Sequence, residues 1–178
     1  MDTARVDFDR QPTLQGPSLG LRPLRASDHD AFVAVANDPL IWEEHPESDR
    51  ATPAKVERFF AGALASGGAL VVTDAAGEII GGSRFEEPDA ERSRVLIDHT
   101  FLARTHWDRE SYTEVKGLMF DHAFATLEIV ELQIGADNAR TRRAAEEFLG
   151  AVHVDTIETP AGDHAVYEIS REAWQQRD

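Results

Sequence analysis

The residues with the clearest chemical meaning lie between Thr105 and Lys116, in the stretch T-H-W-D-R-E-S-Y-T-E-V-K. It follows a strand-like run, Arg94 to Leu102, and precedes the longest helical pattern of the chain, which predicts a turn from a strand to a helix. Such a turn gathers unpaired backbone N–H groups at the positive end of a helix dipole, which favours anion binding. Here, however, Asp108 and Glu110 stand where a phosphate-binding loop would carry glycine.

Two interpretations of these acids stay open. In the first, Ser111 and Glu114 form a capping box and the carboxylates stabilise the helix dipole, so that the protein fills its own anion site. In the second, Arg109 turns toward a phosphate and the site takes a ligand in an altered way.

A second group of charges lies in the first turn of a helix that we expect Asn138 to cap. Arg140, Arg142 and Arg143 are cations at the positive end of a helix dipole, so local stability does not require them. They are candidates for contacts to an anionic group, and surface salt bridging in an acidic protein is the alternative.

The composition indicates one globular domain, with 178 residues of which 42% are hydrophobic. We expect residues 1–18 to be an irregular arm and residues 19–178 to form the single domain. The net charge of −15 disfavours nucleic acid and anionic membranes as partners. It suits a cationic amine, although excess surface acid also serves solubility alone.

The chain has no cysteine, which excludes disulfides and thiolate nucleophiles. None of the seven histidines forms an i, i+4 pair, so no metal site is predicted. The amino terminus lacks an apolar segment behind a basic start, and no apolar run approaches membrane-spanning length. We expect a soluble, cytoplasmic protein.

The hydrophobic periodicity predicts a mixed sheet with helices on both of its faces. The expected strands are Leu19–Leu24, Ala69–Thr73, Glu78–Phe85, Arg94–Leu102, Ile129–Ala136, Ala151–Ile157 and His164–Ser170. The expected helices begin at Ser27, Thr52, Ser111 and Asn138.

Several local motifs occur in this order at characteristic spacings: L-R-P-L from Leu21, D-P-L-I-W ending at Trp42, I-I-G-G-S-R-F from Ile79, T-E-V-K from Thr113, H-A-F-A-T-L from His122, D-N-A-R-T-R-R-A from Asp137, F-L-G-A-V from Phe148, V-Y-E-I from Val166 and R-E-A-W from Arg171. From Leu19 to Trp174 the chain resembles the GNAT acyltransferases, especially the branch of the ribosomal-protein N-terminal acetyltransferases. The resemblance implies an α/β fold with a mixed, mostly antiparallel sheet of about seven strands.

The resemblance also implies transfer of an acetyl group from acetyl-CoA to a primary amine, on a small molecule or a protein N-terminus. It admits a homodimer. By resemblance and by position, the candidate cofactor-binding residues are Phe101, Leu102, Trp107, Asp108, Arg109, Glu110, Ser111, Tyr112, Thr113, Asn138, Arg142 and Arg143.

Candidates for catalysis and for acceptor binding lie elsewhere. Asp98 is the candidate base if it faces the cleft, and His99 should then face the opposite side unless a bulge intervenes. Thr141 stands where relatives carry a serine that assists the thiolate, whereas Ala145 stands at the position of a common tyrosine acid. The candidate acceptor-binding residues are Trp42, Glu43, Glu44 and His45, with Trp42 favoured as a core plug rather than a lid.

The phosphate-binding turn departs from this resemblance. Relatives carry a pattern like W-G-T-G-V-N-T-E-A-K, and here both glycines are acids, Asp108 and Glu110. A like-charge contact at about 4 Å costs several kcal/mol even at a surface-like dielectric. We therefore expect weak or absent acetyl-CoA binding in the usual pose. Two hypotheses follow: an N-acyltransferase, and a non-catalytic or repurposed module that binds a partner or another ligand.

Overall fold

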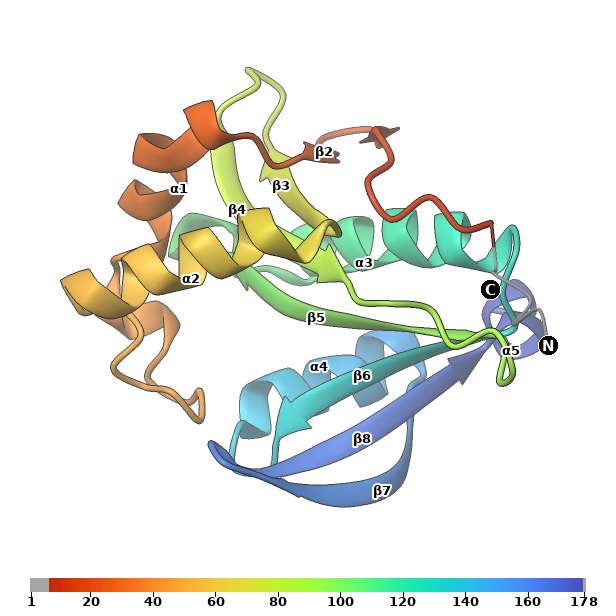
Figure 1. Ribbon diagram of the computed structural model, residues 1–178. Coiled ribbons are helices and arrows are strands. Elements are labelled where there is room, and N and C mark those ends of the chain that lie inside the picture. Colours follow the sequence, from red (N-terminus) through yellow and green to blue (C-terminus); the bar gives the residue numbers. More distant parts are fainter. Residues whose placement is uncertain (1–6, 178) are drawn as a thin grey trace, which may run out of the picture.

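The computed structural model describes residues 7–177, so the first six residues of the predicted arm lie outside the described part (Figure 1). The strands are β1 Leu14–Gln15, β2 Gly20–Pro23, β3 Ala69–Thr73, β4 Ile79–Phe85, β5 Arg94–Leu102, β6 Ile129–Gly135, β7 Val152–Thr159 and β8 Gly162–Ser170. The α-helices are α1 His29–Ala36, α2 Pro53–Ser66, α3 Arg109–Phe124, α4 Ala139–Leu149 and α5 Arg171–Gln175. Short 3₁₀ turns cover Ala26–Asp28, Pro39–Ile41 and Arg104–His106.

The strands form one sheet in the order β1-β2-β3-β4-β5-β6-β8-β7, and the mixed, mostly antiparallel α/β architecture is confirmed. The sheet has eight strands rather than about seven. The additional strand is β1, which lies in the predicted irregular arm and pairs with Gly20 and Leu21 of β2. Alternation cannot reveal a strand of two residues, because its period needs a longer run.

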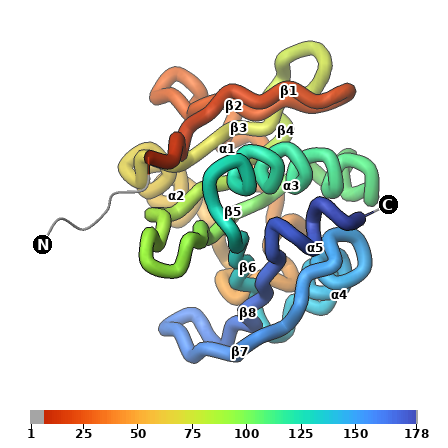
Figure 2. The backbone as a smooth tube through the Cα atoms, turned by 90° about the vertical axis from the view of Figure 1, so that its right-hand side faces the viewer, coloured from red at the N-terminus to blue at the C-terminus, as the bar shows by residue number. Residues whose placement is uncertain are grey.

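Helices cover both faces of the sheet, as Figure 2 shows with α2 on one side and α3 and α4 on the other. The larger core joins α3 and α4 to the sheet and includes the fully buried Met119, Phe120 and Tyr167. The smaller core joins α1 and α2 to the other face around Phe32 and Phe101. The two pairs of helices therefore bury their apolar stripes on opposite faces of the sheet.

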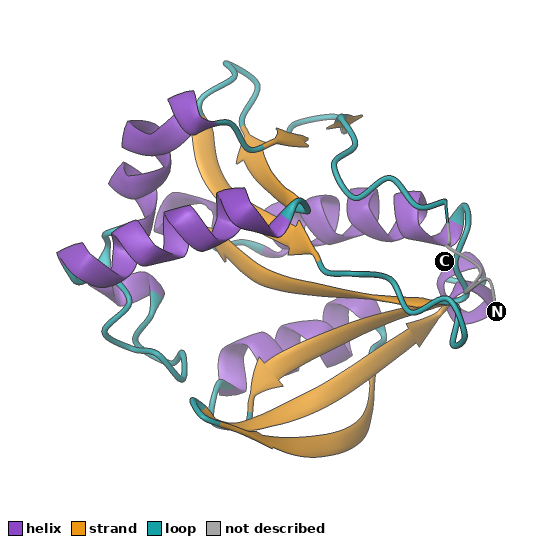
Figure 3. Ribbon diagram, viewed as in Figure 1, coloured by secondary structure: helices purple, strands orange, loops and turns teal. Residues whose placement is uncertain are grey.

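Strands β5 and β6 run parallel but pair along only part of their length. Arg94 to Ile97 pair with Ile129 to Leu132, and beyond Ile97 the strands part while β5 continues to Leu102. Figure 3 shows the two strands diverging toward the amino-terminal ends of α3 and α4. The parting leaves one edge of β5 without a strand partner from residue 98 onward.

A bulge in β5 lies where the strands part. Gly82 pairs with Phe101 and Arg84 with Asp98, so His99 and Thr100 together face the single residue Ser83. His99 has a positive φ of 56°. The bulge that our sequence prediction left open is therefore present. Because of it, the side chains of Asp98 and His99 do not alternate between opposite faces of the sheet as in a regular strand.

The helix starts are in part different from those predicted. Asp108, not Ser111, is the N-cap of α3, and Glu114 accepts hydrogen bonds from the backbone of Ser18 and Leu19 rather than closing a capping box. Asn138 caps α4 as predicted, accepting from the backbone N–H of Thr141.

Two glycine-to-alanine changes are expected to shift stability in opposite directions. A Cβ on Gly81 would lie 2.1 Å from the carbonyl oxygen of Phe101, so Gly81→Ala must separate β4 from β5 and is expected to cost about 2 kcal/mol or more. Gly62 lies in α2 with nothing within 4 Å of a new Cβ. Gly62→Ala, the matched control, should stabilise the fold by about 0.5–1 kcal/mol in urea unfolding. Equal effects would contradict this account.

Candidate functional site

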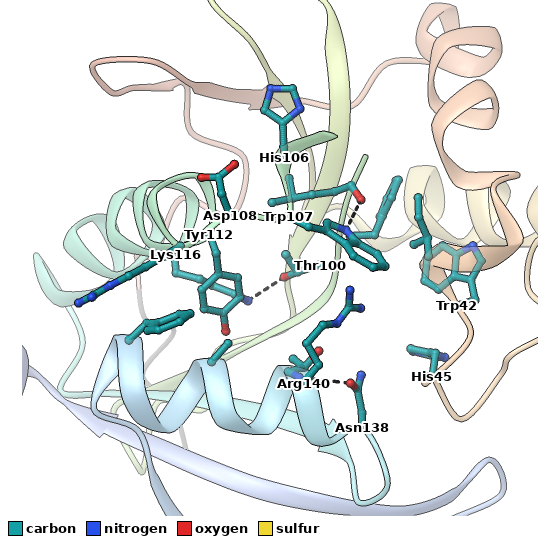
Figure 4. Close-up of a pocket in the computed structure, with 17 residues that line it drawn as sticks. Trp42, His45, Thr100, His106, Trp107, Asp108, Tyr112, Lys116, Asn138 and Arg140 are labelled. Carbon is teal, nitrogen blue, oxygen red and sulfur yellow. Dashed lines mark hydrogen bonds between the residues drawn. The ribbon is translucent and has the colours of Figure 1, made fainter. Parts of the chain in front are cut away.

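A cavity of about 300 Å³, which we call the splay cleft, lies beside the part of β5 that has no strand partner. Its walls come from the end of β5 and the turn after it, the amino-terminal half of α3, one face of α4 and the segment after α1 (Figure 4). The aromatic residues of its lining are Trp42, Phe101, Trp107, Tyr112 and Phe148. Its charged residues other than histidine are Asp108, Arg109, Lys116 and Arg140. With three cations and one carboxylate in its lining, the splay cleft favours an anion, although the net charge of the whole chain is −15.

Lys116 lies at the floor of the splay cleft. It is 5% exposed, and its Nζ donates a hydrogen bond of 2.8 Å to Oγ1 of Thr100, drawn in Figure 4. Oγ1 of Thr100 lies 2.7 Å from Oγ of Ser83, so the bulged strand holds the lysine in place. Burial lowers the pKa of Lys116 to about 8, against the opposing effect of the Asp98 charge. The amine therefore titrates near neutral pH, as a proton acceptor must.

Tyr112 lies beside Lys116, one turn earlier on α3. Nζ of Lys116 is 6.0 Å from the centre of its ring. The Tyr112 hydroxyl is buried and has no hydrogen-bond partner among the described residues, and burial raises its pKa. Thr113 Oγ1 is likewise buried without a partner in residues 7–177. Tyr112 lines the splay cleft, so its hydroxyl is an unused hydrogen-bond donor at the cleft wall.

The first turn of α3 already carries a negative charge. Oδ1 of Asp108 accepts the backbone N–H of Ser111 at 2.7 Å, and Oδ2 accepts the Ser111 hydroxyl at 2.9 Å. The backbone hydrogen bond from Ser111 is the main reason why the pKa of Asp108 is lowered. Glu110 is exposed in the same turn and does not line the cleft. Asp108 thus uses one of the backbone donors that an anion would need.

Trp107 and Arg140 cross the mouth of the splay cleft. The Trp107 indole N–H donates to the carbonyl oxygen of Leu102 at 2.9 Å, on the β5 edge that lacks a strand partner. The Arg140 guanidinium carbon lies 3.4 Å from the Trp107 ring centre, and Figure 4 shows the arginine reaching across from α4. Burial lowers the pKa of Arg140, and its backbone N–H approaches Glu44 at 3.4 Å. These two side chains occupy the β5 edge in this structure.

The other predicted cofactor residues are placed in different ways. Asn138 lines the splay cleft, whereas Arg109 lies with its guanidinium 5.1 Å from the ring centre of Phe148. Arg142 turns away from the cleft and donates to Tyr167 Oη and to the carbonyl oxygen of Ala136. Arg143 is largely exposed, 4.0 Å from Glu147.

A smaller cavity of about 90 Å³, which we call the crossing cavity, continues from the splay cleft between the parted strands. The residues that line both cavities are Trp42, His45, Thr100, Tyr112, Lys116, Asn138 and Thr141. Asp98 and His99 both line the crossing cavity, which the bulge permits. Asp98 Oδ1 accepts the backbone N–H of His99 at 2.7 Å. The predicted base and the predicted donor, Thr141, therefore lie on one connected cavity.

The predicted acceptor-binding residues divide into two pairs. Trp42 is 2% exposed and its indole donates to Ala36 O at 2.8 Å, so it is a core plug that also walls the cleft. His45 lines both cavities, and burial followed by the Arg50 charge lowers its pKa to about 4. Glu43 and Glu44 are exposed and line neither cavity.

Sequence reasoning did not single out Lys116 as a candidate. The available signal was its position beside the buried stripe of the helix, one residue after Val115 and three before Met119. A lysine at such a position is rarely buried unless it is paired with another group. The stack of Arg140 on Trp107 had no such signal, since the two residues meet only through the fold.

A comparison with protein families matches residues 18–152 to the acetyltransferase (GNAT) domain. This chain belongs to the GNAT acetyltransferase family. The predicted resemblance is thereby confirmed, and the family relation supports an acyl-CoA-dependent N-acetyltransferase activity in general terms. A search of the curated proteins finds no match to the sequence.

Solved structures share the fold of this GNAT domain at low identity. A GCN5-related N-acetyltransferase from Brucella melitensis superposes with a TM-score of 0.80 at 20% identity, covering 93% of this chain and 81% of that one. RimJ from Mycobacterium smegmatis, in complex with CoA-disulfide, gives 0.72 at 18%, covering 93% and 90%. Spermidine N-acetyltransferase from Vibrio cholerae, in complex with CoA and spermine, gives 0.70 at 18%, covering 90% and 100%.

Among the helices within residues 7–177, none combines the length and the apolar composition that a membrane span requires. No group of three or more histidine, aspartate or glutamate side chains within residues 7–177 is arranged to hold a metal ion.

Proposed function

We propose that this GNAT domain transfers an acyl group from acyl-CoA to the primary amine of a small molecule or of a protein amino terminus. The observation that carries the proposal is the buried lysine at the floor of the splay cleft. Lys116 is 5% exposed and has a pKa of about 8, and it lies on a cavity whose cations outnumber its carboxylates. A fold does not keep such a lysine for stability, because its burial is unfavourable.

The proposed chemistry needs one proton acceptor and one proton donor. An amine arrives as an ammonium ion and must lose a proton before its nitrogen can attack a carbonyl carbon. We assign the acceptor role to neutral Nζ of Lys116. The negative charge of the nearby Asp98 carboxylate stabilises the positive charge that Nζ gains with the proton. The leaving group needs a proton or a hydrogen bond, and Tyr112 Oη and Thr141 Oγ1 are the candidate donors on the same cavity.

The cleft fits acyl-CoA only in part. The acyl donor would supply an activated thioester, and Arg109 and Arg140 lie where cations would attract its anionic portion. The first turn of α3 fits less well, because Asp108 both repels an anion and occupies the Ser111 N–H. The β5 edge at Leu102 is also occupied, by the Trp107 indole. Binding is therefore proposed to be weak and to require Trp107 and Arg140 to move.

The proposal is tested by measuring thiol release. Because the chain contains no cysteine, a thiol reagent detects only CoA and has no background from the protein. We expect CoA release that depends on an added primary amine and whose rate rises with pH through about 8, where Lys116 loses its proton. The control is a tertiary amine, which cannot form an amide. Release that does not depend on the primary amine at any pH would exclude the transferase.

The second candidate function is a non-catalytic or repurposed GNAT module. Two contacts favour it: Asp108 caps α3 through Ser111, and Trp107 caps the free carbonyl of Leu102. Together they occupy the Ser111 N–H and the Leu102 carbonyl oxygen, two backbone groups that acyl-CoA would otherwise contact. The cytoplasmic location and the homodimer expected from the sequence also belong to the proposal, and gel filtration with light scattering tests the dimer directly.

A further inference from the structure

A second large cavity, which we call the basic pocket, lies between α2 and the face of β4 and β5. Its volume is about 260 Å³. Its permanent charges are those of Arg50, Lys55, Arg58, Arg84 and Glu47. Four cations and one carboxylate line the pocket, with Asp49 and Glu86 just outside the lining beside Lys55 and Arg84, in a chain with a net charge of −15. Such a local reversal of charge points to an anionic ligand rather than to solubility.

Arg50 is held rigidly at one wall of the basic pocket. It is 8% exposed, and its guanidinium lies 4.9 Å from the ring centre of Trp42 and 4.7 Å from that of Phe59. Its Nε and Nη2 both donate to Oε2 of Glu47. Its Nη1 is buried without a partner among the described residues. One donor of a fixed guanidinium fork is therefore unused.

Arg84 is a second buried guanidinium at this pocket. It is 9% exposed, and burial is the main reason why its pKa is lowered. Its Nε has no hydrogen-bond partner within residues 7–177, and its Nη1 lies 3.7 Å from Glu86, beyond hydrogen-bond length. The surrounding protein thus leaves this buried cation incompletely compensated.

The neighbouring carboxylates offset only part of the positive charge. Glu47 pairs with Arg50, and Asp49 pairs with Lys55 at 2.6 Å. Arg58 is exposed on α2 and forms no ion pair within the described part of the chain. Arg58 and Arg84 are therefore the cations of the pocket that have the most hydrogen-bond donors available for an incoming anion.

The basic pocket adjoins the crossing cavity, which in turn adjoins the proposed site of acyl transfer. Arg50 and His99 line both the basic pocket and the crossing cavity. Lys116 and Thr100 line both the crossing cavity and the splay cleft. His99 and Thr100 are consecutive residues of β5, so the basic pocket and the splay cleft both adjoin the crossing cavity at the bulge.

We propose that the basic pocket binds a carboxylate of the amine acceptor, so that the acceptor is an amino acid or an acidic amino terminus rather than a polyamine. The planar fork of Arg84 suits a planar carboxylate, which accepts two parallel hydrogen bonds, and Arg50 adds the one donor, Nη1, that Glu47 leaves unused. The pocket orients the acceptor so that its amine enters the crossing cavity beside Lys116. This inference rests on the proposed transferase function, and it adds a carboxylate to the amine acceptor that the net charge suits.

The test uses ω-amino acids from glycine to 6-aminohexanoate, each beside its primary amide. Calorimetry without an acyl donor measures binding, and the thiol-release assay measures KM and kcat. We expect at least one acid to bind about tenfold or more tightly than its amide, with the preference appearing in KM more than in kcat. The most tightly bound member reports the spacing between amine and carboxylate. Acids and amides that bind equally would overturn the proposal.

Three variants locate the preference. Arg84→Gln and the exposed Arg58→Gln are each expected to reduce the preference for acid over amide several-fold. Arg92→Gln removes an arginine that is exposed and distant from the pocket lining, and it should leave the preference unchanged. Arg58→Gln keeps the test valid if Arg84→Gln fails to fold. A preference that persists undiminished in both pocket variants would contradict the assignment.

The two proposals fail in different ways. If acids bind in preference to amides but no CoA is released, the basic pocket stands and the transferase does not. If CoA is released equally with acids and amides, the transferase stands and the carboxylate site does not.

Discussion

Replacing Asp108 and Glu110 together with glycine is expected to raise the affinity for acetyl-CoA by about tenfold or more. Removing the Asp108 charge at the N-cap of α3, with the exposed Glu110 charge beside it, relieves a repulsion that is worth several kcal/mol for a contact at about 4 Å, and only about 1.4 kcal/mol is needed for a tenfold change. The substitution also frees the Ser111 N–H that Asp108 now occupies. Calorimetry with acetyl-CoA measures the difference between the variant and the wild-type protein.

Asp108→Asn distinguishes the effect of the negative charge from the effect of the occupied backbone N–H of Ser111. Asparagine is as good an N-cap as aspartate, so this variant keeps the hydrogen bond to Ser111 while losing the negative charge. If repulsion dominates, Asp108→Asn gains a large part of the affinity of the double glycine variant. If occupied backbone donors dominate, only the glycine variant improves. Wild-type binding in the micromolar range would show that the acids do not weaken the site.

The same titration decides between the two functions. Binding by the glycine variant alone would mean that the acids closed the site, which favours the repurposed module. Binding by neither protein would remove the acyltransferase proposal, because a transferase must bind its donor. In that case the contacts of Trp107 with Leu102 and Arg140 would represent the permanent state of the cleft.

The sequence was sufficient for the fold because its helices and strands are long and strongly patterned. The limits of β5, Arg94–Leu102, agree with the predicted run, since alternation over nine residues defines a strand. The cap of α3 was missed by three residues, because Asp108 and Ser111 are both good caps and the sequence does not show which side chain finds the free N–H groups.

The candidate site was less accessible to sequence analysis, because its features depend on residues far apart in the chain. The unpaired donors of Arg50 and Arg84 become meaningful only when α2 is placed over β4 and β5. Net charge could not locate the basic pocket for the same reason. A total of −15 averages the whole surface, whereas a ligand responds to the charges within about a Debye length of its pocket.

Lys116→Met is expected to stabilise the protein while abolishing transfer. In the folded protein Lys116 loses its proton at a pH of about 8, whereas the ordinary pKa is 10.5. The unfolded chain therefore binds more protons between these values, so stability rises with pH through this window. Below a pH of about 8 the full penalty for charging the buried amine remains, on the order of 3 kcal/mol. Methionine removes that penalty and loses one hydrogen bond to Thr100, worth about 1 kcal/mol.

The net expectation for Lys116→Met is a gain of about 2 kcal/mol in the free energy of unfolding at pH 7, which shrinks as the pH rises toward 10.5. Amine-dependent CoA release should fall by about 100-fold or more, because a general base contributes that much. Lys116→Arg is the conservative control, since it keeps a cation that cannot lose its proton at these pH values. A structural role predicts that arginine preserves the rate, whereas a base predicts that it does not. Retention of the wild-type rate and pH profile by either variant would reject Lys116 as the base, and a loss of stability in Lys116→Met would show that the buried charge is better compensated than its surroundings indicate.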